Sequence, residues 1–433
     1  MSKMSPQTAT ATHEIRGKTL RIVLACGSFN IGGISTQALT LATEFRNLGH
    51  HTIALILDPF GELYESFQDT FDQVVVLRRG WEGRETFLRR VLLVIEKLSP
   101  DAILGSAVPS VQAIYPYLDP SIVRITTIHS IAEDELRDGT ANDTSTDWVV
   151  AVANNIATKL QTRPLACQVA VIPVGVSISA HRRPEIHSTE LRLAYVGRLS
   201  RAAKNLGQLT AICEALHADG VPFSLTIIGS GEEQTSLMRD FSRTAAAANV
   251  NFVGQLTPAE VRQRLLDIDV LLLVSTYEST PHAVLEAMEA GVVPVASRIP
   301  GATEDIIEDG VSGFLCDTND SLQYVAALTN LNTDRQLLRR MSLAARTVIA
   351  SRFGAPRMAR QYLDLIKKTL ASNSLSRKKL EEATHIRCCP ELRHSCYGFA
   401  RQVRRRAGDL YRALAHGIRP CCLPTSTGES KFS

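Results

Sequence analysis

A pair of glutamates stands eight positions apart in the stretch STYESTPHAVLEAMEAG, which covers residues 275 to 291. Glu278 precedes a Thr-Pro pair, and Glu286 follows it. Ionised carboxylates only accept hydrogen bonds, so they suit the hydroxyl groups of ribose and of other sugars. The same spacing also fits an ordinary helix start with a solvated glutamate on each side. The two glutamates alone therefore leave both interpretations open.

The residues between the glutamates favour the start of a helix. Thr280 is a good N-cap and Pro281 a good first helical residue. The N-terminus of such a helix has unpaired N–H groups and a positive end, which together suit a phosphate. His282 lies one helical turn before Glu286, on the same face. The stretch thus offers donors for a diphosphate, with hydroxyl acceptors on either side.

Two cations follow a different apolar run. Arg198 and Lys204 stand in GRLSRAAKN, directly after LRLAYV. A departing nucleoside diphosphate gains negative charge, and two fixed cations can neutralise that charge in place of a metal. Taken singly, such side chains are also common as solvated loop charges.

The elements that would position these residues form two series. Short apolar strands alternate with helical patterns from Leu20 to about Val176, and the alternation restarts at Leu191. This pattern indicates parallel sheets covered on both faces, so two series predict two Rossmann-like domains. Ligands of open parallel sheets bind beyond the carboxyl ends of the strands. The features that follow strands are Gly32-Gly33, His129, Arg198, Gly229-Ser230-Gly231 and Glu278. We expect them to lie at such edges.

Several motifs occur together in one order along the chain. They are an early GG followed by LATEFRNLGHHT, then GRLSRAAKN, IIGSGEE, NFVGQLT and ESTPHAVLEAMEAGVVPVASRIPGATEDIIEDGVSGFL. This ordered set resembles glycosyltransferase family four, whose members are retaining enzymes of the GT-B fold that use sugar nucleotides. The resemblance covers about residues 19 to 370 and is strongest from 191 to 316.

The resemblance implies an α/β fold of the GT-B type, with two Rossmann-like domains facing each other across a cleft. Beyond the part that the resemblance covers, the sequence predicts a basic, helical or irregular C-terminal extension. The predicted divisions are a disordered arm (1–18), an N-terminal acceptor domain (19–178), a linker (179–190), a C-terminal sugar-nucleotide domain (191–353), a helix packing back on the N-terminal domain (354–371) and a basic, cysteine-containing tail (372–433). The run SNSLSRKK at the start of the tail is expected to be a polar hinge.

The resemblance also implies roles for individual residues. The catalytic set would be His129, Arg198, Lys204 and Glu278, and the donor-binding set Gly32, Gly33, Gly231, Pro281, His282, Ala283 and Glu286. Glu286 would bind the ribose hydroxyls, and Glu278 would hold hydroxyls of the donor sugar. Arg198 and Lys204 would grip the diphosphate, and His129 would lie close to the transferred sugar. The backbone of Gly32-Gly33 would approach the phosphate or the acceptor.

No metal or other cofactor is expected. Asp267 and Asp269 match a D-x-D pattern that binds a divalent cation in other glycosyltransferases, but they precede the strand VLLLV and so belong to its amino end. The run GSFNIGG is not G-x-G-x-x-G, which argues against NAD. The expected donor is a UDP-, GDP- or ADP-sugar.

The expected reaction moves a sugar to an acceptor hydroxyl with retention, in polysaccharide or glycolipid assembly of the cell envelope. A double displacement needs a carboxylate nucleophile, and no residue is obviously placed for one. The resemblance favours a front-face route in which the leaving phosphate helps to deprotonate the acceptor. A sugar-nucleotide epimerase of the GT-B fold and a non-catalytic sugar-nucleotide sensor remain as alternatives.

The remaining sequence bears on location and partners. The N-terminus lacks the apolar region of a secretory signal, and Cys26, Cys167, Cys213 and Cys316 stand mostly beside apolar residues, as free thiols do. The cytoplasm is therefore the expected compartment, with peripheral attachment to the inner face of the membrane as an option. The expected partners are a nucleotide sugar and a glycan or lipid-linked acceptor, and no nucleic acid.

The tail from residue 372 carries twelve Lys and Arg against five Asp and Glu, about +7. Its apolar residues from Phe399 to Leu414 fall at helical spacing, which would suit an anionic membrane surface. Its cysteines, Cys388, Cys389, Cys396, Cys421 and Cys422, could instead hold zinc, although their spacing fits no familiar ligand pattern. The third interpretation is a loosely ordered tail without a catalytic role.

Overall fold

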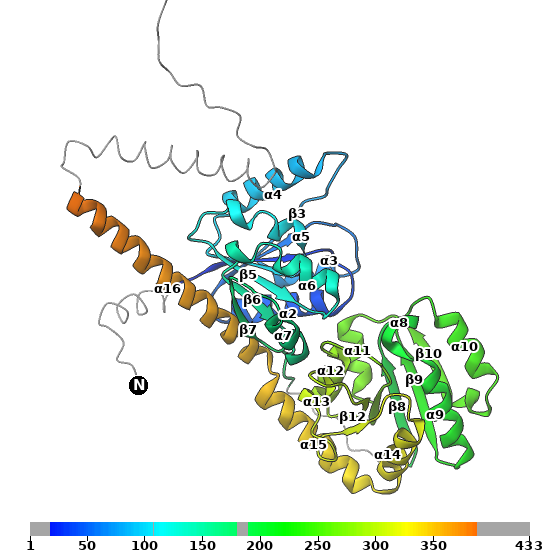
Figure 1. Ribbon diagram of the computed structural model, residues 1–433. Helices are drawn as coiled ribbons and strands as arrows, with labels where there is room; N and C mark the ends of the chain where they lie inside the picture. The colour runs from blue at the N-terminus through cyan, green and yellow to red at the C-terminus, as the bar shows by residue number, and fades with distance from the viewer. Residues whose placement is uncertain (1–17, 107, 180–188, 388–433) are drawn as a thin grey trace, which may run out of the picture. The chain divides into compact units, whose positions relative to one another are not determined.

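The structure, a computed structural model, describes residues 18–106, 108–179 and 189–387, with the backbone alone for residue 202 and residues 374–387 (Figure 1). The first sheet has seven strands in the order β3-β2-β1-β4-β5-β6-β7, all parallel. The strands are β1 (Arg21–Cys26), β2 (His51–Ile56), β3 (Gln73–Val76), β4 (Ala102–Ser106), β5 (Val123–Ile128), β6 (Trp148–Ala151) and β7 (Gln168–Val171).

Helices cover both faces of this sheet. They are α2 (Gly33–Asn47), α3 (Tyr64–Thr70), α4 (Arg84–Leu98), α5 (Pro109–Gln112), α6 (Glu133–Thr140) and α7 (Asn154–Gln161), with short 3-10 turns η1 (Tyr115–Tyr117) and η2 (Asp143–Ser145). Leu41 and Phe45 of α2 pack with Leu24 of β1 on one face. On the other face, Val91 of α4 packs with Val23 of β1. Since adjacent strand residues face opposite sides, strands with two covered faces must be apolar throughout, as the sequence pattern predicts.

The second sheet has six parallel strands in the order β10-β9-β8-β11-β12-β13. The strands are β8 (Leu191–Val196), β9 (Phe223–Ile228), β10 (Val250–Gly254), β11 (Val270–Leu273), β12 (Val293–Ser297) and β13 (Phe314–Cys316). The helices are α8 (Arg201–Lys204), α9 (Gly207–Ala218), α10 (Gln234–Ser242), α11 (Pro258–Leu265), α12 (His282–Ala290), α13 (Thr303–Ile306), α14 (Ser321–Thr333) and α15 (Arg335–Arg352), with the turn η3 (Ala245–Asn249). The two parallel Rossmann-like sheets confirm the predicted fold class.

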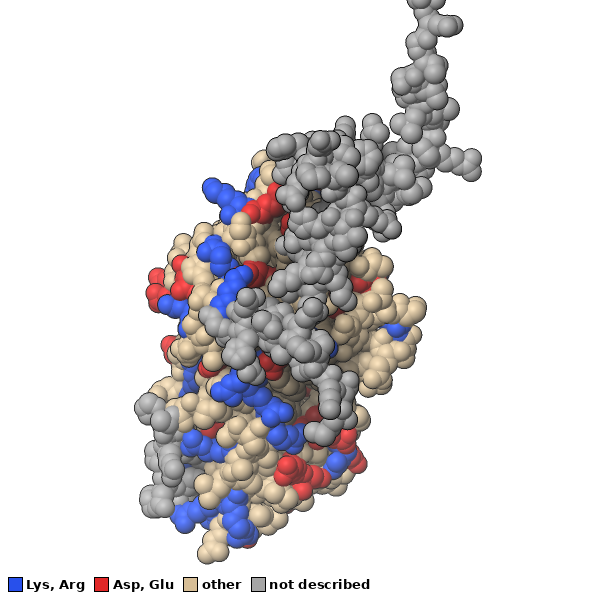
Figure 2. Space-filling view, turned by 90° about the vertical axis from the view of Figure 1, so that its left-hand side faces the viewer, with Lys and Arg blue, Asp and Glu red and all other residues tan. Residues whose placement is uncertain are grey.

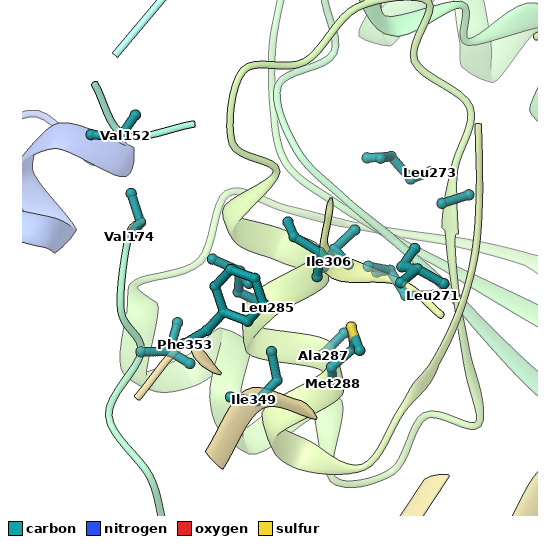
Figure 3. Packing of buried hydrophobic residues seen from close by; sticks show 14 of the residues in the cluster. Val152, Val174, Leu271, Leu273, Leu285, Ala287, Met288, Ile306, Ile349 and Phe353 are labelled. Carbon is teal, nitrogen blue, oxygen red and sulfur yellow. The ribbon is translucent and has the colours of Figure 1, made fainter. Parts of the chain in front are cut away.

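One buried apolar cluster is continuous between the two sheets. Val152 and Val174 of the first half pack in the same cluster as Leu285 of α12 and Phe353 after α15, as Figure 3 shows. Near them, the Val176 amide donates to the Phe353 carbonyl at 2.8 Å. The two chain crossings between the halves are therefore joined by backbone hydrogen bonds as well as by apolar packing.

The last described helix, α16 (Ala355–Arg387), begins on the first half. Its apolar residues Met358, Tyr362 and Ile366 pack in the cluster that contains Leu24. The predicted polar hinge at residues 372–379 is wrong, because α16 continues through it to Arg387. That run contains neither Gly nor Pro, the residues that usually end a helix. The disordered arm (1–18) and the linker (179–190) fall almost wholly outside the described residues, as does most of the tail, and the domain boundaries stay predictions.

The described surface carries both signs of charge. Figure 2 shows Lys and Arg interspersed with Asp and Glu on one face. In the described part of the chain, no helix combines the length and the apolar composition needed to cross a bilayer. Cys26, Cys213 and Cys316 are free and buried, as predicted, and Cys167 is free and partly buried.

The cluster between the sheets gives a test of this fold. Leu285 is fully buried (0% exposed), so Leu285→Ala removes apolar contacts and leaves a cavity. We expect it to lower the free energy of unfolding by about 2–5 kcal/mol. The control Leu343→Ala, at a leucine that is 68% exposed on α15, should change that free energy by less than about 0.5 kcal/mol. Urea unfolding followed by circular dichroism measures both, and equal effects would contradict this packing.

Candidate functional site

An ion pair joins two of the predicted catalytic residues. Lys204, at the end of α8, places its Nζ 2.6 Å from Oε1 of Glu278, in the loop between β11 and α12. The Ser275 hydroxyl donates to the same oxygen at 2.7 Å. Both side chains of the pair are largely buried, so the charge of each needs the other. Within the described residues, Oε2 of Glu278 accepts no hydrogen bond and is the oxygen left to accept a sugar hydroxyl.

The loop that carries the cations has an unusual backbone. Ala203 and Asn205 lie in the left-handed region, with φ of 66° and 47°. Ala203 is disfavoured there because of its Cβ, and its carbonyl accepts a hydrogen bond from the Thr276 amide at 2.8 Å. This backbone contact, together with the ion pair, fixes the loop after β8 against the loop after β11.

Arg198 lies two residues after β8 and is exposed. Its carbonyl accepts a hydrogen bond from the buried Tyr195 hydroxyl at 3.0 Å, which fixes the backbone at this position. Within the described ranges its guanidinium makes no hydrogen bond or ion pair. By contrast, Arg201 pairs with Glu233 at 3.1 Å. The backbone of Arg198 is thus held in place, while its guanidinium has no partner among the described residues and is available to bind an anion.

Gly231 supports the same loop by close approach. A Cβ on Gly231 would lie 2.2 Å from the Leu199 carbonyl oxygen, and one on Gly229 would lie 1.9 Å from that of Gly197. Only glycine allows the two loops to come this close. Gly231 was predicted to bind the donor. Its contacts in the structure show that it lets the loop after β9 approach the loop after β8, and donor binding stays a prediction.

The helix start between the glutamates differs from the prediction. Pro281 is the residue that caps α12, which begins at His282, and Thr280 does not act as the N-cap. The Thr280 hydroxyl instead donates to the Val152 carbonyl at 3.3 Å. The amides of His282 and Ala283 donate no hydrogen bond within residues 18–106, 108–179 and 189–387. The unpaired donors expected at this helix end are therefore present, one residue later than predicted.

Gly33 and His282 come together from the two halves of the chain. Gly33 begins α2, and a Cβ on it would lie 2.7 Å from Nε2 of His282. Any larger residue at position 33 would displace the imidazole. Gly32 differs, because a Cβ there would meet no atom within 4 Å, so its prediction as a phosphate contact receives no steric support.

His129 follows β5 and faces the same region. Burial lowers its pKa to about 3, with a smaller contribution from the charge of His282. Burial also lowers the pKa of His282 to about 4. Both imidazoles are therefore neutral at pH 7. Nε2 of His129 is buried and has no hydrogen-bond partner in the described part of the protein. A buried nitrogen without a hydrogen-bond partner destabilises the folded protein unless a ligand or a water molecule bonds to it.

Three further polar residues at this edge were missed by the sequence analysis. Tyr277, directly before Glu278, shares hydrogen bonds with the hydroxyls of Ser130 and Ser279 and accepts one from the Ile131 amide at 3.1 Å. Asn155 donates to the Glu278 carbonyl at 3.1 Å, and its Oδ1 is buried without a partner. Glu135 accepts from the His129 amide at 2.6 Å. Only the position of Tyr277 beside Glu278 could have drawn attention to it.

Glu286 lies on α12 beside a small cavity. Burial raises its pKa to about 7, and the charge of Arg262 opposes part of that shift. The cavity measures about 20 Å³ and is lined by residues that include Gln37, His282 and Glu289. It holds about one water molecule, so a ribose would need this space to widen.

A larger cavity, of about 180 Å³, lies elsewhere. Its lining includes Asn154, Thr280, Asp305 and Arg357 and none of the residues predicted for the donor site. The candidate site is therefore the group of polar residues around the Lys204–Glu278 pair and not this cavity. Asp269 also plays no part in it, since its buried carboxylate pairs with Arg192 at 3.0 Å. Among the described residues, no group of three or more His, Cys, Asp or Glu could hold a metal.

Comparison with solved structures defines the class of fold. HepE of Anabaena, in complex with UDP and glucose, superposes with a TM-score of 0.68 at 17% identity, over 81% of this chain and 100% of its own. A glycosyltransferase of Rickettsia africae gives a TM-score of 0.67 at 15% identity, over 81% of this chain and 99% of its own. At these identities the likeness concerns the fold, which is GT-B.

Family models narrow the class further. A model described as "Glycosyltransferase Family 4" matches residues 31–180, and one described as "Glycosyl transferases group 1" matches residues 177–348. The chain belongs to glycosyltransferase family four, of the group 1 type.

Curated relatives share part of this sequence. A putative colanic acid biosynthesis glycosyltransferase of Salmonella typhimurium is 29% identical over 208 residues, 46% of this chain and 51% of its own length. An amylovoran biosynthesis glycosyltransferase of Erwinia amylovora is 30% identical over 184 residues, 41% of this chain and 45% of its own. The chain thus spans about half the length of the curated relatives it matches.

The hydrogen bonds of Tyr277 predict a structural effect. Tyr277→Phe leaves partly buried hydroxyls and the Ile131 amide short of a partner, so it should cost about 1–3 kcal/mol of unfolding free energy. Amide hydrogen exchange at residues 129–132 should also become faster. Tyr64→Phe is the matched control, because among the described residues its hydroxyl accepts a hydrogen bond only from the exposed Gln68 side chain. Unchanged exchange in Tyr277→Phe would contradict this connection.

The raised pKa of Glu286 predicts a dependence of stability on pH. The folded protein holds this proton up to about pH 7, whereas an unfolded carboxyl releases it near 4.5. The contribution of Glu286 to the free energy of unfolding is therefore fully present below pH 4.5 and is lost as the pH rises towards 7. Glu286→Gln should remove that fall and be more stable than wild type at pH 8, by roughly 1–3 kcal/mol. Thermal unfolding at pH 5 and pH 8 tests this, and equal differences at both pH values would refute it.

Proposed function

We propose that this chain is a retaining glycosyltransferase that moves a sugar from a nucleoside diphosphate sugar to an acceptor hydroxyl without a metal ion. The observation that carries the proposal is the uncommitted guanidinium of Arg198, in the same loop region after β8 as Lys204, which pairs with Glu278. Family membership supports transfer chemistry, and the UDP in the HepE complex supports a UDP-sugar as the first donor to try. GDP- and ADP-sugars remain candidates.

The diphosphate would lie between cations and a helix end. Arg198 would bind its oxygens directly, and Lys204 would do so while it holds Glu278. The amides of His282 and Ala283 would donate to the same group, since α12 presents its positive end there. These groups bind most strongly when the diphosphate carries its full negative charge, after the sugar has left.

The sugar and the ribose would be held by acceptors. Oε2 of Glu278 would accept a hydroxyl of the donor sugar, and Glu286 would accept the ribose hydroxyls. The neutral imidazole of His129 would hydrogen-bond through its orphaned Nε2 to the transferred sugar. Pro281 would fix the backbone from which the amides of α12 project, and Gly32 and Gly33 would allow the other half of the chain to approach the phosphates.

The proposed route is a front-face substitution. The bond between the anomeric carbon and the diphosphate oxygen breaks, and the acceptor oxygen attacks the same face. The acceptor proton passes to the leaving phosphate oxygen. Among the described residues, Glu278 pairs with Lys204 and Glu135 accepts the amides of His129 and Ser130, so neither carboxylate is free of partners. This arrangement supports positioning and charge stabilisation as the source of catalysis.

The curated relatives support a finer proposal for the biological role. Their names concern exopolysaccharides, namely colanic acid and amylovoran. We therefore propose assembly of a cell-envelope or exported polysaccharide, on a glycan or lipid-linked acceptor. The reaction would take place in the cytoplasm, at the inner face of the membrane.

The test combines donor binding with turnover. The protein would be treated with EDTA and titrated with UDP-, GDP- and ADP-glucose in a calorimeter, and donor hydrolysis would be followed alongside. We expect one donor to bind selectively, and Glu286→Ala to abolish that binding. Arg198→Ala should slow turnover by about 10²–10³-fold with normal folding. Arg201→Ala is the control, because Arg201 pairs with Glu233, and it should change turnover less than about threefold.

The outcomes separate the possibilities. Full turnover in Arg198→Ala would refute the proposed charge stabilisation. Absence of binding to every donor, in a sample with a normal circular dichroism spectrum, would refute the transferase itself. Turnover that appears only after Mg²⁺ or Mn²⁺ is restored would overturn metal independence alone.

A further inference from the structure

A group of exposed aromatic and basic residues lies away from the donor site. Trp81, in the loop between β3 and α4, is fully exposed (108%), and Phe60, in the loop between β2 and α3, is 62% exposed. Arg78 places its guanidinium 5.7 Å from the centre of the Phe60 ring. With the exposed Arg79 and Arg84, these residues form what we call the aromatic–basic patch (Phe60, Arg78, Arg79, Trp81 and Arg84).

Trp81 lies in a loop whose backbone is held in place by hydrogen bonds. Arg90 of α4 donates to the Arg78 carbonyl at 2.8 Å and to the Glu82 carboxylate at 2.7 Å. Residues on both sides of Trp81 are therefore tied to the helix that follows. The indole projects into solvent from a fixed backbone, which is an unfavourable place for a large apolar surface unless something covers it.

The charges of the patch are not neutralised locally. Arg78, Arg79 and Arg84 form no ion pair among the described residues. The neighbouring acids are occupied: Glu82 pairs with Arg90, Glu85 pairs with Arg89, and Asp58 and Glu62 each accept a backbone amide. The patch thus combines uncommitted positive charge with exposed aromatic rings.

We propose that the aromatic–basic patch docks on the surface of an anionic lipid bilayer. A bilayer interface offers phosphates for arginine and a less polar layer for indole within the same few ångströms. A neutral glycan would match the tryptophan but would leave the arginines without counter-charges. Phe60 and Trp81 follow adjacent parallel strands, so both loops leave the sheet at one edge and can meet a flat surface together.

The patch lies at the same edge of the first sheet as Gly33 and His129, since all of these residues follow the carboxyl ends of parallel strands. β3 is two positions from β1 in the sheet order, about 10 Å at the usual strand spacing. A membrane on the patch would thus hold lipid-linked molecules near the opening of the proposed site. Docking itself does not depend on the proposed transfer reaction and is measured separately from it.

Trp81 provides its own probe, because the chain has two tryptophans and the other, Trp148, is buried (7% exposed). The full-length protein would be mixed with vesicles of phosphatidylcholine containing about one third phosphatidylglycerol, and with pure phosphatidylcholine vesicles. Trp81→Phe gives the Trp148 background to subtract. We expect the Trp81 emission to shift to the blue with the anionic vesicles only, and the shift to weaken as salt is added.

A double charge-reversal variant distinguishes membrane binding by the aromatic–basic patch from an effect of the net charge of the protein. Arg78→Glu with Arg79→Glu should lower sedimentation with anionic vesicles by about tenfold or more. The control, Arg239→Glu with Arg243→Glu on and after α10, changes net charge equally and should sediment as wild type. Trp81→Ala should lower sedimentation by roughly fivefold, and donor binding should be unchanged in all of these variants.

Three results would overturn the proposal. One is sedimentation with no shift of Trp81 emission, which would assign membrane binding to another part of the chain, such as the basic tail. Another is a Trp81 shift with soluble maltoheptaose and none with vesicles, which would make the patch a glycan site. The third is equal loss of sedimentation in both charge-reversal pairs, which would reduce the effect to net charge.

Discussion

The ion pair between Lys204 and Glu278 is the interaction on which the rest of the site depends. It joins the loop after β8 to the loop after β11, and it lies where water is largely excluded, so that neither charge is stable there without the other. The left-handed Ala203 is tolerated because its carbonyl is tied to Thr276 within the same junction. Arg198 and the start of α12 are positioned relative to each other through this junction, although neither belongs to the pair.

Desolvation sets the charges around this pair. It lowers the pKa of His129 and His282 far below neutrality and raises that of Glu286 to about 7. The two imidazoles therefore add no positive charge, and Arg198 and Lys204 remain as cations for the diphosphate. This matters for a diphosphate, because a neutral imidazole can donate to or accept from a sugar hydroxyl without competing for the phosphate. A ribose that donates hydrogen bonds to Glu286 would favour its ionised form and so oppose the effect of burial.

The sequence predicted the periodic and local features and missed those that depend on distant segments. The alternation of apolar strands and helices predicted both sheets, and the ordered motifs predicted the family. The Thr-Pro pair at Thr257 caps α11, because Glu260 completes a capping box. The same pair at Thr280 does not, since Ala283 stands where Glu260 would and the hydroxyl bonds to Val152 instead. Tyr277 was missed because its partner Ser130 is 147 positions away, a contact that no local pattern encodes.

The order of the first sheet has a consequence for how an acceptor could arrive. The strands that precede Gly33, Phe60 and Trp81 are consecutive in the sheet, running from β1, beside the central strand β4, to the edge strand β3. A surface that contacts the edge loops is then separated from the central loops by about two strand spacings, roughly 10 Å. That distance is on the order of one or two sugar units. If the aromatic–basic patch docks as proposed, a headgroup of that length would bridge the two positions while its lipid stays in the bilayer.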